Sequence, residues 1–291
     1  MEFRTILVAL GGGSASAGAV ELACRLARRF SGHLEALHAR PDPRDMVAAV
    51  ADGFATPLAG TLVEKAIADA AEAAKKARAL FDAAVSRHAL PLRDAPPPLG
   101  TDPALRRQAS AAWREETGFG AGIIADRARI FDLLVLGRSG RVVGEPHSEA
   151  IEEALLSSGR PVLVAPAEPP KALGETIALA WNDTPEAARA VTAALPFLAH
   201  AQAVHVLSLG DKNAEELAQH LAWYGIRAAA TALDPAGRGG IGELLLSAAR
   251  EQGADLLVMG GYGHAPWRET LFGGATRAVL GTSRLPLLLS H

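Results

Sequence analysis

The sequence predicts an α/β protein made of two tandem, open, doubly wound parallel-sheet domains with five strands each. Short apolar runs of strand length alternate along the chain with segments whose apolar residues recur at helical spacing. Runs such as "TIALAW" and "LPLLLS" show no regular polar alternation, which is typical of parallel strands covered by helices on both faces. The pattern also occurs twice, so we expect two copies of one domain.

The internal repeat consists of three pairs of matching segments in the same order. The pairs are 5–27 with 176–199, 131–140 with 254–263, and 158–166 with 282–290. We therefore expect one domain at residues 1–168 and a second at 174–291. The segment 165–175, which contains three prolines, is the expected linker.

Strands and helices alternate from end to end in the second copy. The expected strands are 176–181, 202–208, 226–231, 255–260 and 286–290, and the expected helices lie near 184–197, 213–223, 240–252 and 273–283.

The first copy is longer than the second. The offset between the copies is 171 positions at Thr5 but 123 at Asp132, so the first copy has 48 additional residues between these points. Most of them fall in 60–88, whose alanines and charges predict one long amphipathic helix. The proline-rich segment 91–103 then ends it.

The composition excludes several classes of protein. The chain has 291 residues, 49% of them hydrophobic, enough for two domains with real cores. Its net charge of −3, without a basic block, argues against nucleic-acid binding. No stretch approaches the roughly 20 apolar residues of a membrane-spanning helix, and the first apolar run is too short for a signal peptide. The single cysteine, Cys24, fits a helix core in a reducing compartment, so we expect a cytoplasmic protein without membrane partners.

Unusual residues follow two strands of the second copy. In open α/β sheets, ligands bind at the carboxyl ends of the strands, where the strand order reverses. "WNDT" (181–184) follows the first strand and "GGYGH" (260–264) follows the fourth. Asp132 and Asp255 instead open equivalent strands at the opposite rim, so we predict that they are caps or loop anchors rather than catalytic acids.

Two glycine clusters frame the end of the second copy. Gly260, Gly261 and Gly263 permit left-handed backbone angles and close approach to a ligand. Gly273 and Gly274 begin the next expected helix, whose free amides and dipole attract phosphate. The two clusters together could wrap a polyphosphate. The alternative interpretation is that these glycines serve only a tight turn and helix packing.

The glycine pattern resembles the nucleotide signature of the ATP-binding universal stress proteins, in which Gly-x-x-Gly is followed, nine residues later, by Gly-Ser/Thr. Here it runs from Gly260 to Gly263 and then to Gly273 and Gly274. The resemblance covers both copies, so the chain is similar to a tandem member of that family. It implies the adenine-nucleotide α-hydrolase-like fold, two copies joined through their last strands, and a ligand such as ATP, ADP or AMP, with or without Mg²⁺.

The resemblance also implies a set of nucleotide-binding residues in the second copy. They are Trp181, Asn182, Asp183, Thr184, Val206, Gly260, Gly261, Gly263, His264, Gly273, Gly274, Ala275 and Thr276. Val206, expected at the end of the second strand, would line the adenine pocket. Asn182 replaces the family's Asp after the first strand, which weakens the case for Mg²⁺ there. Gly274 replaces the family's Ser/Thr, and Thr276 is the nearest hydroxyl.

The first copy departs further from the family pattern. Gly137 and Gly140 keep its beginning, but Ala150 stands ten residues later in an acidic segment. Gly11 occupies the position of the family's first-strand Asp. We therefore expect a degenerate or empty first pocket and one working site per chain.

Three functional hypotheses remain open. The first is a stress-response binding module regulated by an adenine nucleotide. The second is a weak ATPase at the same site, with His264 or a carboxylate near Asn182 as the acid/base group. The third is a nucleotide-free scaffold that acts through assembly and the 60–88 helix. The absence of a Gly-x-x-x-x-Gly-Lys-Ser/Thr pattern argues against a P-loop NTPase. Two copies in one chain would form an intramolecular pseudo-dimer, which leaves room for a homodimer of the whole chain.

Overall fold

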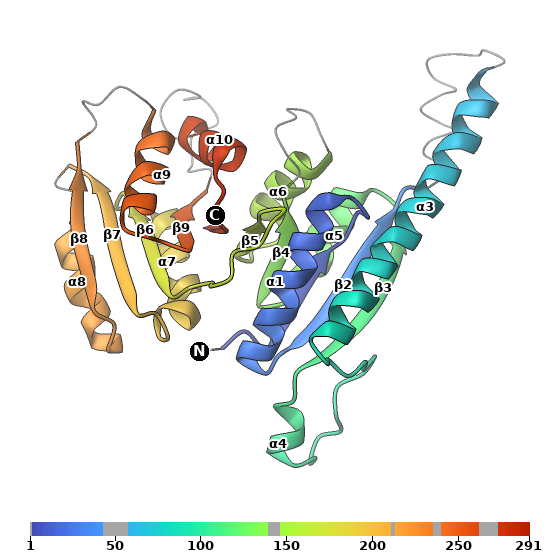
Figure 1. Ribbon diagram of the computed structural model, residues 1–291, viewed down its shortest axis with the longest axis horizontal. Helices are drawn as coiled ribbons and strands as arrows, with labels where there is room; N and C mark the ends of the chain where they lie inside the picture. Colours follow the sequence, from blue (N-terminus) through green and yellow to red (C-terminus); the bar gives the residue numbers. More distant parts are fainter. Residues whose placement is uncertain (1, 43–57, 139–145, 211–212, 235–239, 262–272) are drawn as a thin grey trace.

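The computed structural model describes residues 2–42, 58–138, 146–210, 213–234, 240–261 and 273–291 (Figure 1). The first half contains β1 (Thr5–Ala9), α1 (Ser14–Phe30), β2 (His33–Arg40), α3 (Leu58–Arg87), α4 (Pro103–Arg106), β3 (Ser110–Thr117), α5 (Gly120–Ala128), β4 (Leu133–Gly137), α6 (Pro146–Ser157) and β5 (Val162–Ala165). The second half contains β6 (Thr176–Trp181), α7 (Pro185–Leu198), β7 (Ala203–Leu209), α8 (Ala214–Leu221), the 3-10 turn η1 (Ala222–Tyr224), β8 (Ala228–Leu233), α9 (Ile241–Glu251), β9 (Leu256–Gly260), α10 (Gly273–Thr282) and β10 (Leu287–Ser290).

The strands form one sheet in the order β3-β2-β1-β4-β5-β10-β9-β6-β7-β8. Neighbouring strands are parallel, except that β5 and β10 pair antiparallel. Each half therefore has five parallel strands, and the halves join through their last strands, so the predicted fold class is confirmed. Leu163 lies opposite Leu288, and the two residues hold equivalent register positions beside Val135 of β4 and Val258 of β9, so this junction is a pseudo-two-fold.

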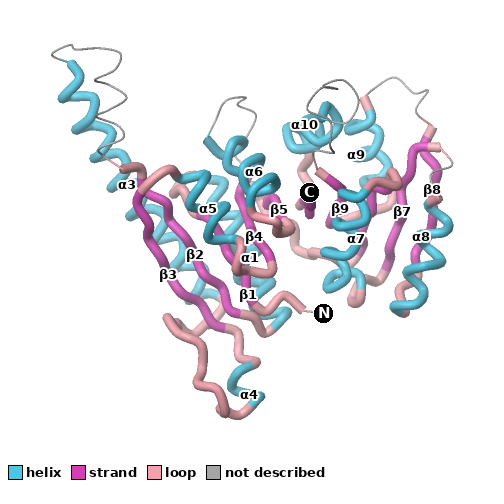
Figure 2. Tube along the Cα trace, turned by 180° about the vertical axis from the view of Figure 1, so that it is seen from behind, coloured by secondary structure: helices cyan, strands magenta, loops and turns pink. Residues whose placement is uncertain are grey.

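Helices cover both faces of the sheet (Figures 1 and 2). Buried side chains of α1, α3, α7 and α8 form one continuous core with one face of the strands. Buried side chains of α5, α6, α9 and α10 form a second core with the other face. Because both faces are covered, the strands carry apolar side chains on both sides, which explains the uninterrupted apolar runs in the sequence.

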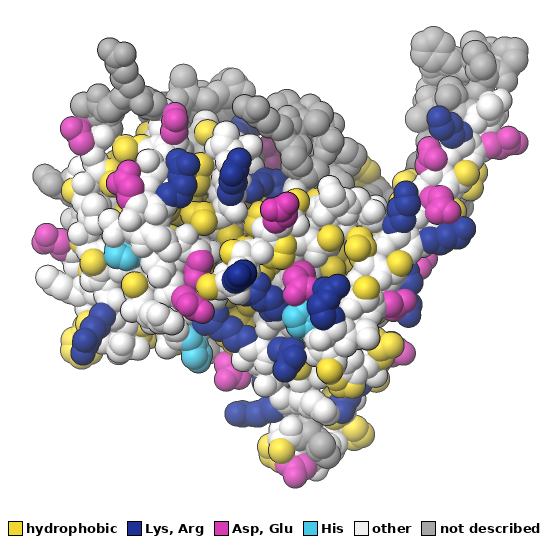
Figure 3. All heavy atoms as spheres, viewed as in Figure 1, with side chains coloured by type: hydrophobic (Ala, Val, Ile, Leu, Met, Phe, Trp, Pro, Cys, Tyr) yellow, Lys and Arg dark blue, Asp and Glu magenta, His cyan; other side chains and the backbone are white. Residues whose placement is uncertain are grey.

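The long helix predicted at 60–88 is α3, and it projects beyond the sheet (Figure 1). Its buried positions, such as Ala77, Phe81 and Ala84, lie in the C-terminal part, against α1 and β2. Charged side chains of both signs follow the rest of the helix (Figure 3), and Arg78 pairs with Asp82 at 3.0 Å. None of the described helices is both long enough and apolar enough to cross a membrane.

The two acidic residues predicted as anchors do hold the starts of neighbouring strands. The Asp132 carboxylate accepts hydrogen bonds from the backbone N–H groups of Arg4 and Thr5, at 2.8 and 2.9 Å. The Asp255 carboxylate accepts from Gly174 at 2.6 Å and Glu175 at 3.0 Å. Each half therefore uses an equivalent aspartate to satisfy backbone N–H donors at the rim opposite the carboxyl ends of the strands. The prediction that Asp132 and Asp255 are anchors is confirmed.

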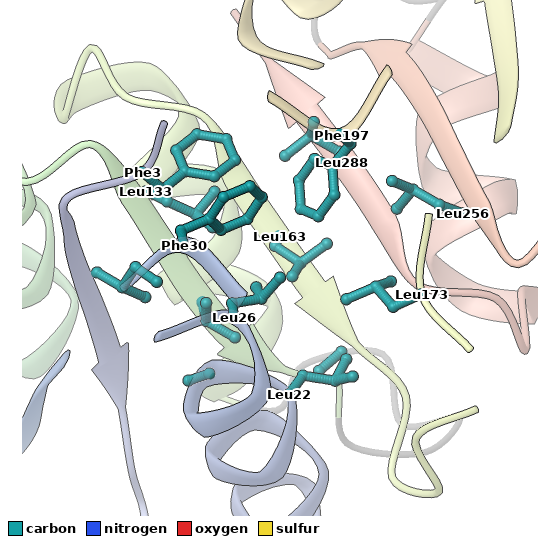
Figure 4. Close-up of a cluster of buried hydrophobic side chains, with 14 of the residues drawn as sticks. Phe3, Leu22, Leu26, Phe30, Leu133, Leu163, Leu173, Phe197, Leu256 and Leu288 are labelled. Carbon is teal, nitrogen blue, oxygen red and sulfur yellow. The ribbon is translucent and has the colours of Figure 1, made fainter. Parts of the chain in front are cut away.

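An aromatic cluster joins the two halves beneath the β5–β10 junction (Figure 4). Phe3 and Phe30 of the first half meet Phe197 of α7, with ring centroids 5.4 and 5.7 Å apart. Phe197 is fully buried, and the aromatic pairs add to the free energy gained by burying its ring. The halves consequently share a hydrophobic core instead of meeting through polar surfaces.

Helix α1 also holds the linker between the halves. Arg25 donates hydrogen bonds to the carbonyls of Pro170 and Lys171, and Arg29 donates to the carbonyl of Leu173 at 2.6 Å. These charge-assisted bonds fix a segment that has no secondary structure of its own.

Candidate functional site

The two predicted site segments lie side by side at the carboxyl rim of the second half. β6 and β9 are neighbouring strands, with Ala180 paired to Met259, so Trp181 and Gly260 end these strands next to each other. Strand order reverses between β6 and β9, because the strands that follow them in the sequence run to opposite sides. This is the position at which open α/β sheets bind ligands.

The turn after β6 starts α7 with a well-defined cap. Asp183 has a left-handed backbone, with φ of 57°, and Thr184 is the N-cap. The Thr184 hydroxyl donates to Asn182 Oδ1 at 2.9 Å and accepts from the backbone N–H of Ala187 at 3.3 Å. The turn is therefore held by its own side chains, with the amide of Asn182 fixed at the rim.

Gly260 ends β9 beneath the first turn of α7. A Cβ at this position would lie 2.8 Å from the backbone nitrogen of Ala187 and 2.9 Å from Cβ of Glu186. Its φ is not positive, so Gly260 does not use the left-handed backbone that a glycine permits. The described structure accounts for the glycine by close packing of a helix on a strand.

Gly261 does not have a left-handed backbone either. Its N–H donates to the carbonyl of Ser290 at 2.9 Å, and its carbonyl lies 3.1 Å from Nδ1 of His291. The residue is buried, and its amide continues the hydrogen bonding between β9 and β10. This amide is consequently not free to bind a phosphate.

Helix α10 begins at Gly273, as predicted. Gly274 is exposed, and a Cβ at this position would meet no atom within 4 Å. The carbonyl of Ala275 instead faces α9, where a Cβ on Gly242 would lie 2.9 Å away. Thr276 is only 3% exposed. Among Gly274, Ala275 and Thr276, whose exposure the structure describes, Gly274 offers the most open approach to the helix start.

Val206 does not end its strand. β7 continues to Leu209, and Val206 is fully buried in the core shared with α7 and α8. The expected position of Val206 is therefore wrong, although the strand end itself was expected at 208, within one residue of where β7 ends. Ser208, which the sequence analysis did not select, lies beside Trp181 in register and donates its hydroxyl hydrogen to the carbonyl of Gly210 at 3.1 Å. The sequence feature that could have identified Ser208 is a polar residue near the end of an otherwise apolar strand.

A buried carboxylate also lies at this rim. Glu186, in the first turn of α7, is 5% exposed and pairs with Arg189 at 3.0 Å. Acidic residues are common in the first turn of a helix, so the sequence carried no sign of a special role. Trp181 Nε1 is buried beside this turn, at the end of β6, and has no hydrogen-bond partner among the described residues.

Two of the predicted site residues, Gly263 and His264, lie outside the described residues. Within the described part of the chain, no group of three or more His, Cys, Asp or Glu side chains could hold a metal ion. Cys24 is fully buried, and burial raises the pKa of its thiol to about 12, as expected for an unreactive core cysteine.

The carboxyl rim of the first half, which lacks the second glycine cluster of the signature, differs in which backbone amides are available. Gly12, at the position of Asp183, has φ of 80°, and the N–H groups of Gly11 and Gly12 both donate to Ser16 Oγ, at 2.9 and 3.2 Å. Amides that could bind an anion are thus occupied by the chain itself. A Cβ on Gly137 would overlap the carbonyl of Ala15, just as Gly260 packs on α7.

The fold and rim define an α/β protein of two similar halves, in which strand order reverses between β6 and β9, the place where sheets of this class bind ligands. The chain belongs to the universal stress protein family, whose model matches residues 2–158. This match lies in the first half, although the fuller glycine signature lies in the second. No curated protein sequence matches the chain.

Solved structures show the same fold over the whole chain. A universal stress protein from Archaeoglobus fulgidus is 15% identical, with a TM-score of 0.67, and the match covers 100% of this chain and 99% of the other. A protein of unknown function from Pseudomonas aeruginosa PAO1 is 18% identical, with a TM-score of 0.55, covering 99% and 92% of the two chains.

Proposed function

We propose that this protein binds an adenine nucleotide, ATP, ADP or AMP, in its second half and acts in the stress response as a nucleotide-dependent binding or regulatory module. In this proposal the chain divides into domains at 1–168 and 174–291, and only the second has a working site. Membership of the universal stress protein family and the position of the signature residues support it.

The observation that carries the proposal is the placement of the two ends of the signature. Gly260 ends β9 at the point where strand order reverses. Gly274 is exposed in the first turn of α10, the next described helix after β9 in the sequence. A helix start on the binding rim attracts phosphate through its unpaired amides and its dipole. Trp181 and the turn at 182–184 would then face the nucleotide from β6.

Binding rather than catalysis is the function that this rim favours. Asn182 Oδ1 accepts a hydrogen bond from Thr184 and brings no negative charge, so it is a poor replacement for the family's carboxylate toward Mg²⁺. Any hydrolysis at this site is therefore expected to be slow, and we assign no catalytic residue.

A nucleotide-free scaffold is the second candidate, and a specific observation favours it. Gly137 and Gly260 are both required by packing of the following helix, one in each half. A glycine conserved between the copies by packing says nothing about a ligand. The scaffold hypothesis thus explains part of the signature, but it does not explain the exposed Gly274.

The first experiment is therefore a substitution at Gly274. Nothing lies within 4 Å of a Cβ there, so Gly274→Val should leave the fold intact while placing a branched side chain against the bound phosphates. We expect nucleotide released from the denatured wild-type protein, detected by mass spectrometry at about one equivalent per chain, to be lost in the variant. Calorimetric titration with ATP and Mg²⁺ should show at least a tenfold weaker Kd, about 1.4 kcal/mol.

Gly281→Val is the matched control, because Gly281 lies in the same helix, also without neighbours, at the end away from the rim. It should bind like the wild type. If neither purified wild-type protein nor protein titrated with ATP holds nucleotide, the binding proposal is wrong and the scaffold hypothesis gains support.

A further inference from the structure

The two outer strands of the sheet are built differently. β3, at one end, carries Arg114, Glu115 and Glu116, and the segment before it covers its first residues: Arg93 N–H donates to the carbonyl of Ala111 at 2.8 Å. Charged side chains and a covering segment are devices that prevent a sheet edge from pairing with another chain.

β8 forms the other end of the sheet (Figures 1 and 2). Its sequence, Ala-Ala-Ala-Thr-Ala-Leu, contains no charge and no proline, and Ala229 and Ala232 are exposed. It pairs with β7 along its full length, and no other described strand pairs with its outer side. Among the described residues, the six residues of this neutral strand therefore leave the backbone donors and acceptors of their outer side without a partner strand.

Large aromatic side chains lie just before the same edge. Trp223 is 88% exposed and Tyr224 is 56% exposed, in the turn that leads into β8. Exposed tryptophan and tyrosine are enriched in protein interfaces because they bury much area with little loss of side-chain freedom. The aromatic turn and the open edge together define one surface.

The charges that flank β8 indicate which strand would pair with it. Arg227 precedes the strand and Asp234 follows it, and both residues are exposed. In an antiparallel pair of identical strands, the start of one lies beside the end of the other, so each Arg227 comes close to Asp234 of the second copy. A parallel arrangement would instead bring like charges together.

The chain already contains a junction of this kind. β5 and β10 pair antiparallel, with the equivalent residues Leu163 and Leu288 opposite each other. A two-fold axis perpendicular to the sheet, passing beside Ala230 or Thr231, would join two β8 strands by the same geometry. We propose that β8 is the dimerisation edge of the protein, and that its occupant is β8 of a second copy.

The test is the mass of the full-length protein in solution. Sedimentation velocity should give twice the 30.2 kDa of one chain for the wild type. The double variant Ala229→Lys, Ala232→Lys should give one chain, since it puts four lysines into the paired edge. Thr117→Lys, at the exposed end of β3, is the matched control and should stay dimeric.

Disulfide cross-linking tests the register directly. Opposite residues in an antiparallel pair have Cβ atoms about 4.5–5.5 Å apart, close enough for a bridge after small movement. Ala230→Cys or Thr231→Cys should therefore form a covalent dimer on oxidation, whereas Thr117→Cys should not; the buried Cys24 does not compete. A monomeric wild type, or a dimer that survives the lysine variant and forms no cross-link, overturns the proposal. Nucleotide binding is independent of either result.

Discussion

The carboxyl rims of the two halves share a backbone but differ in what they leave open. Gly137 and Gly260 occupy equivalent positions and are both pressed against the first turn of a helix. In the first half, Ser16 takes up the amides of Gly11 and Gly12. In the second half, the turn is capped by Thr184.

This comparison separates glycines that pack from glycines that are available to a ligand. A glycine such as Gly137 or Gly260 is present in both halves, including the first half, where Ser16 already binds the amides of the turn. The shared fold is enough to explain such a glycine. By the spacing of the signature, Gly273 and Gly274 correspond to Ala150 and Ile151 of the first half, so neither has a glycine equivalent there. The features unique to the second half are therefore the ones on which the nucleotide proposal depends.

We expect the largest effect from replacing the glycine that packs against a helix in both halves. Gly137→Ala should lower the free energy of unfolding by about 3 kcal/mol, because the new Cβ overlaps the backbone of Ala15 and neither strand nor helix can easily move. Gly260→Ala should cost less, about 1–2 kcal/mol, since its closest contacts are at 2.8 Å. Urea denaturation of each variant measures both values.

Gly281→Ala serves as the control for these substitutions, because its Cβ would meet nothing within 4 Å. It should be neutral or slightly stabilising, as expected for alanine in a helix. If Gly137→Ala is as mild as this control, the packing explanation for the shared glycine fails.

A second difference between the halves is an ion pair found in the first. Arg127 of α5 donates to both carboxylate oxygens of the buried Glu35, at 2.7 and 2.8 Å. At the equivalent positions of the second half stand Arg250 and His205, and Arg250 donates to the carbonyl of Leu246. Burial raises the pKa of Glu35, but the bonds and charges of Arg127 and Arg114 outweigh it and hold the pKa below its ordinary value.

Because its pKa is lower in the folded protein, Glu35 stabilises the fold above the unfolded pKa and loses this contribution as the pH falls through the folded pKa. Glu35→Gln should cost about 1–2 kcal/mol at pH 7 and reduce the loss of stability between pH 5 and pH 3. Urea midpoints measured across that range give the result. An unchanged pH dependence would show that the pair does not matter.

The smallest expected effect sharpens the comparison with the family. Asn182→Asp restores a carboxylate at the rim of β6, where hard oxygen ligands favour Mg²⁺. We expect Mg²⁺ to tighten ATP binding about tenfold more in this variant than in the wild type, about 1.4 kcal/mol. Calorimetric titrations with Mg²⁺ and with EDTA compare the two proteins. Equal dependence on Mg²⁺ in both would place the metal away from residue 182, if it binds at all.

Much of the fold could be predicted because each strand and helix pattern in the matched segments occurs twice in the sequence. Strand and helix bounds in the second half agree with the structure to within two residues, and Asp132 and Asp255 were recognised as anchors from their position at strand starts. Backbone angles at Gly260 and Gly261 could not be predicted, since the helix and strand that contact them are distant in sequence. The burial of Val206 likewise depends on where β7 ends relative to its neighbours.

The linker held by Arg25 and Arg29 has a consequence for how the protein responds to dilution. A dimer of separate chains dissociates as its concentration falls, but here the partner strand is tethered, so its effective concentration stays high at any dilution. Fixing the tether against α1 also limits exchange of halves between chains, because β10 is guided to β5 of its own chain. The pseudo-dimer should therefore be as persistent at low protein concentration as at high.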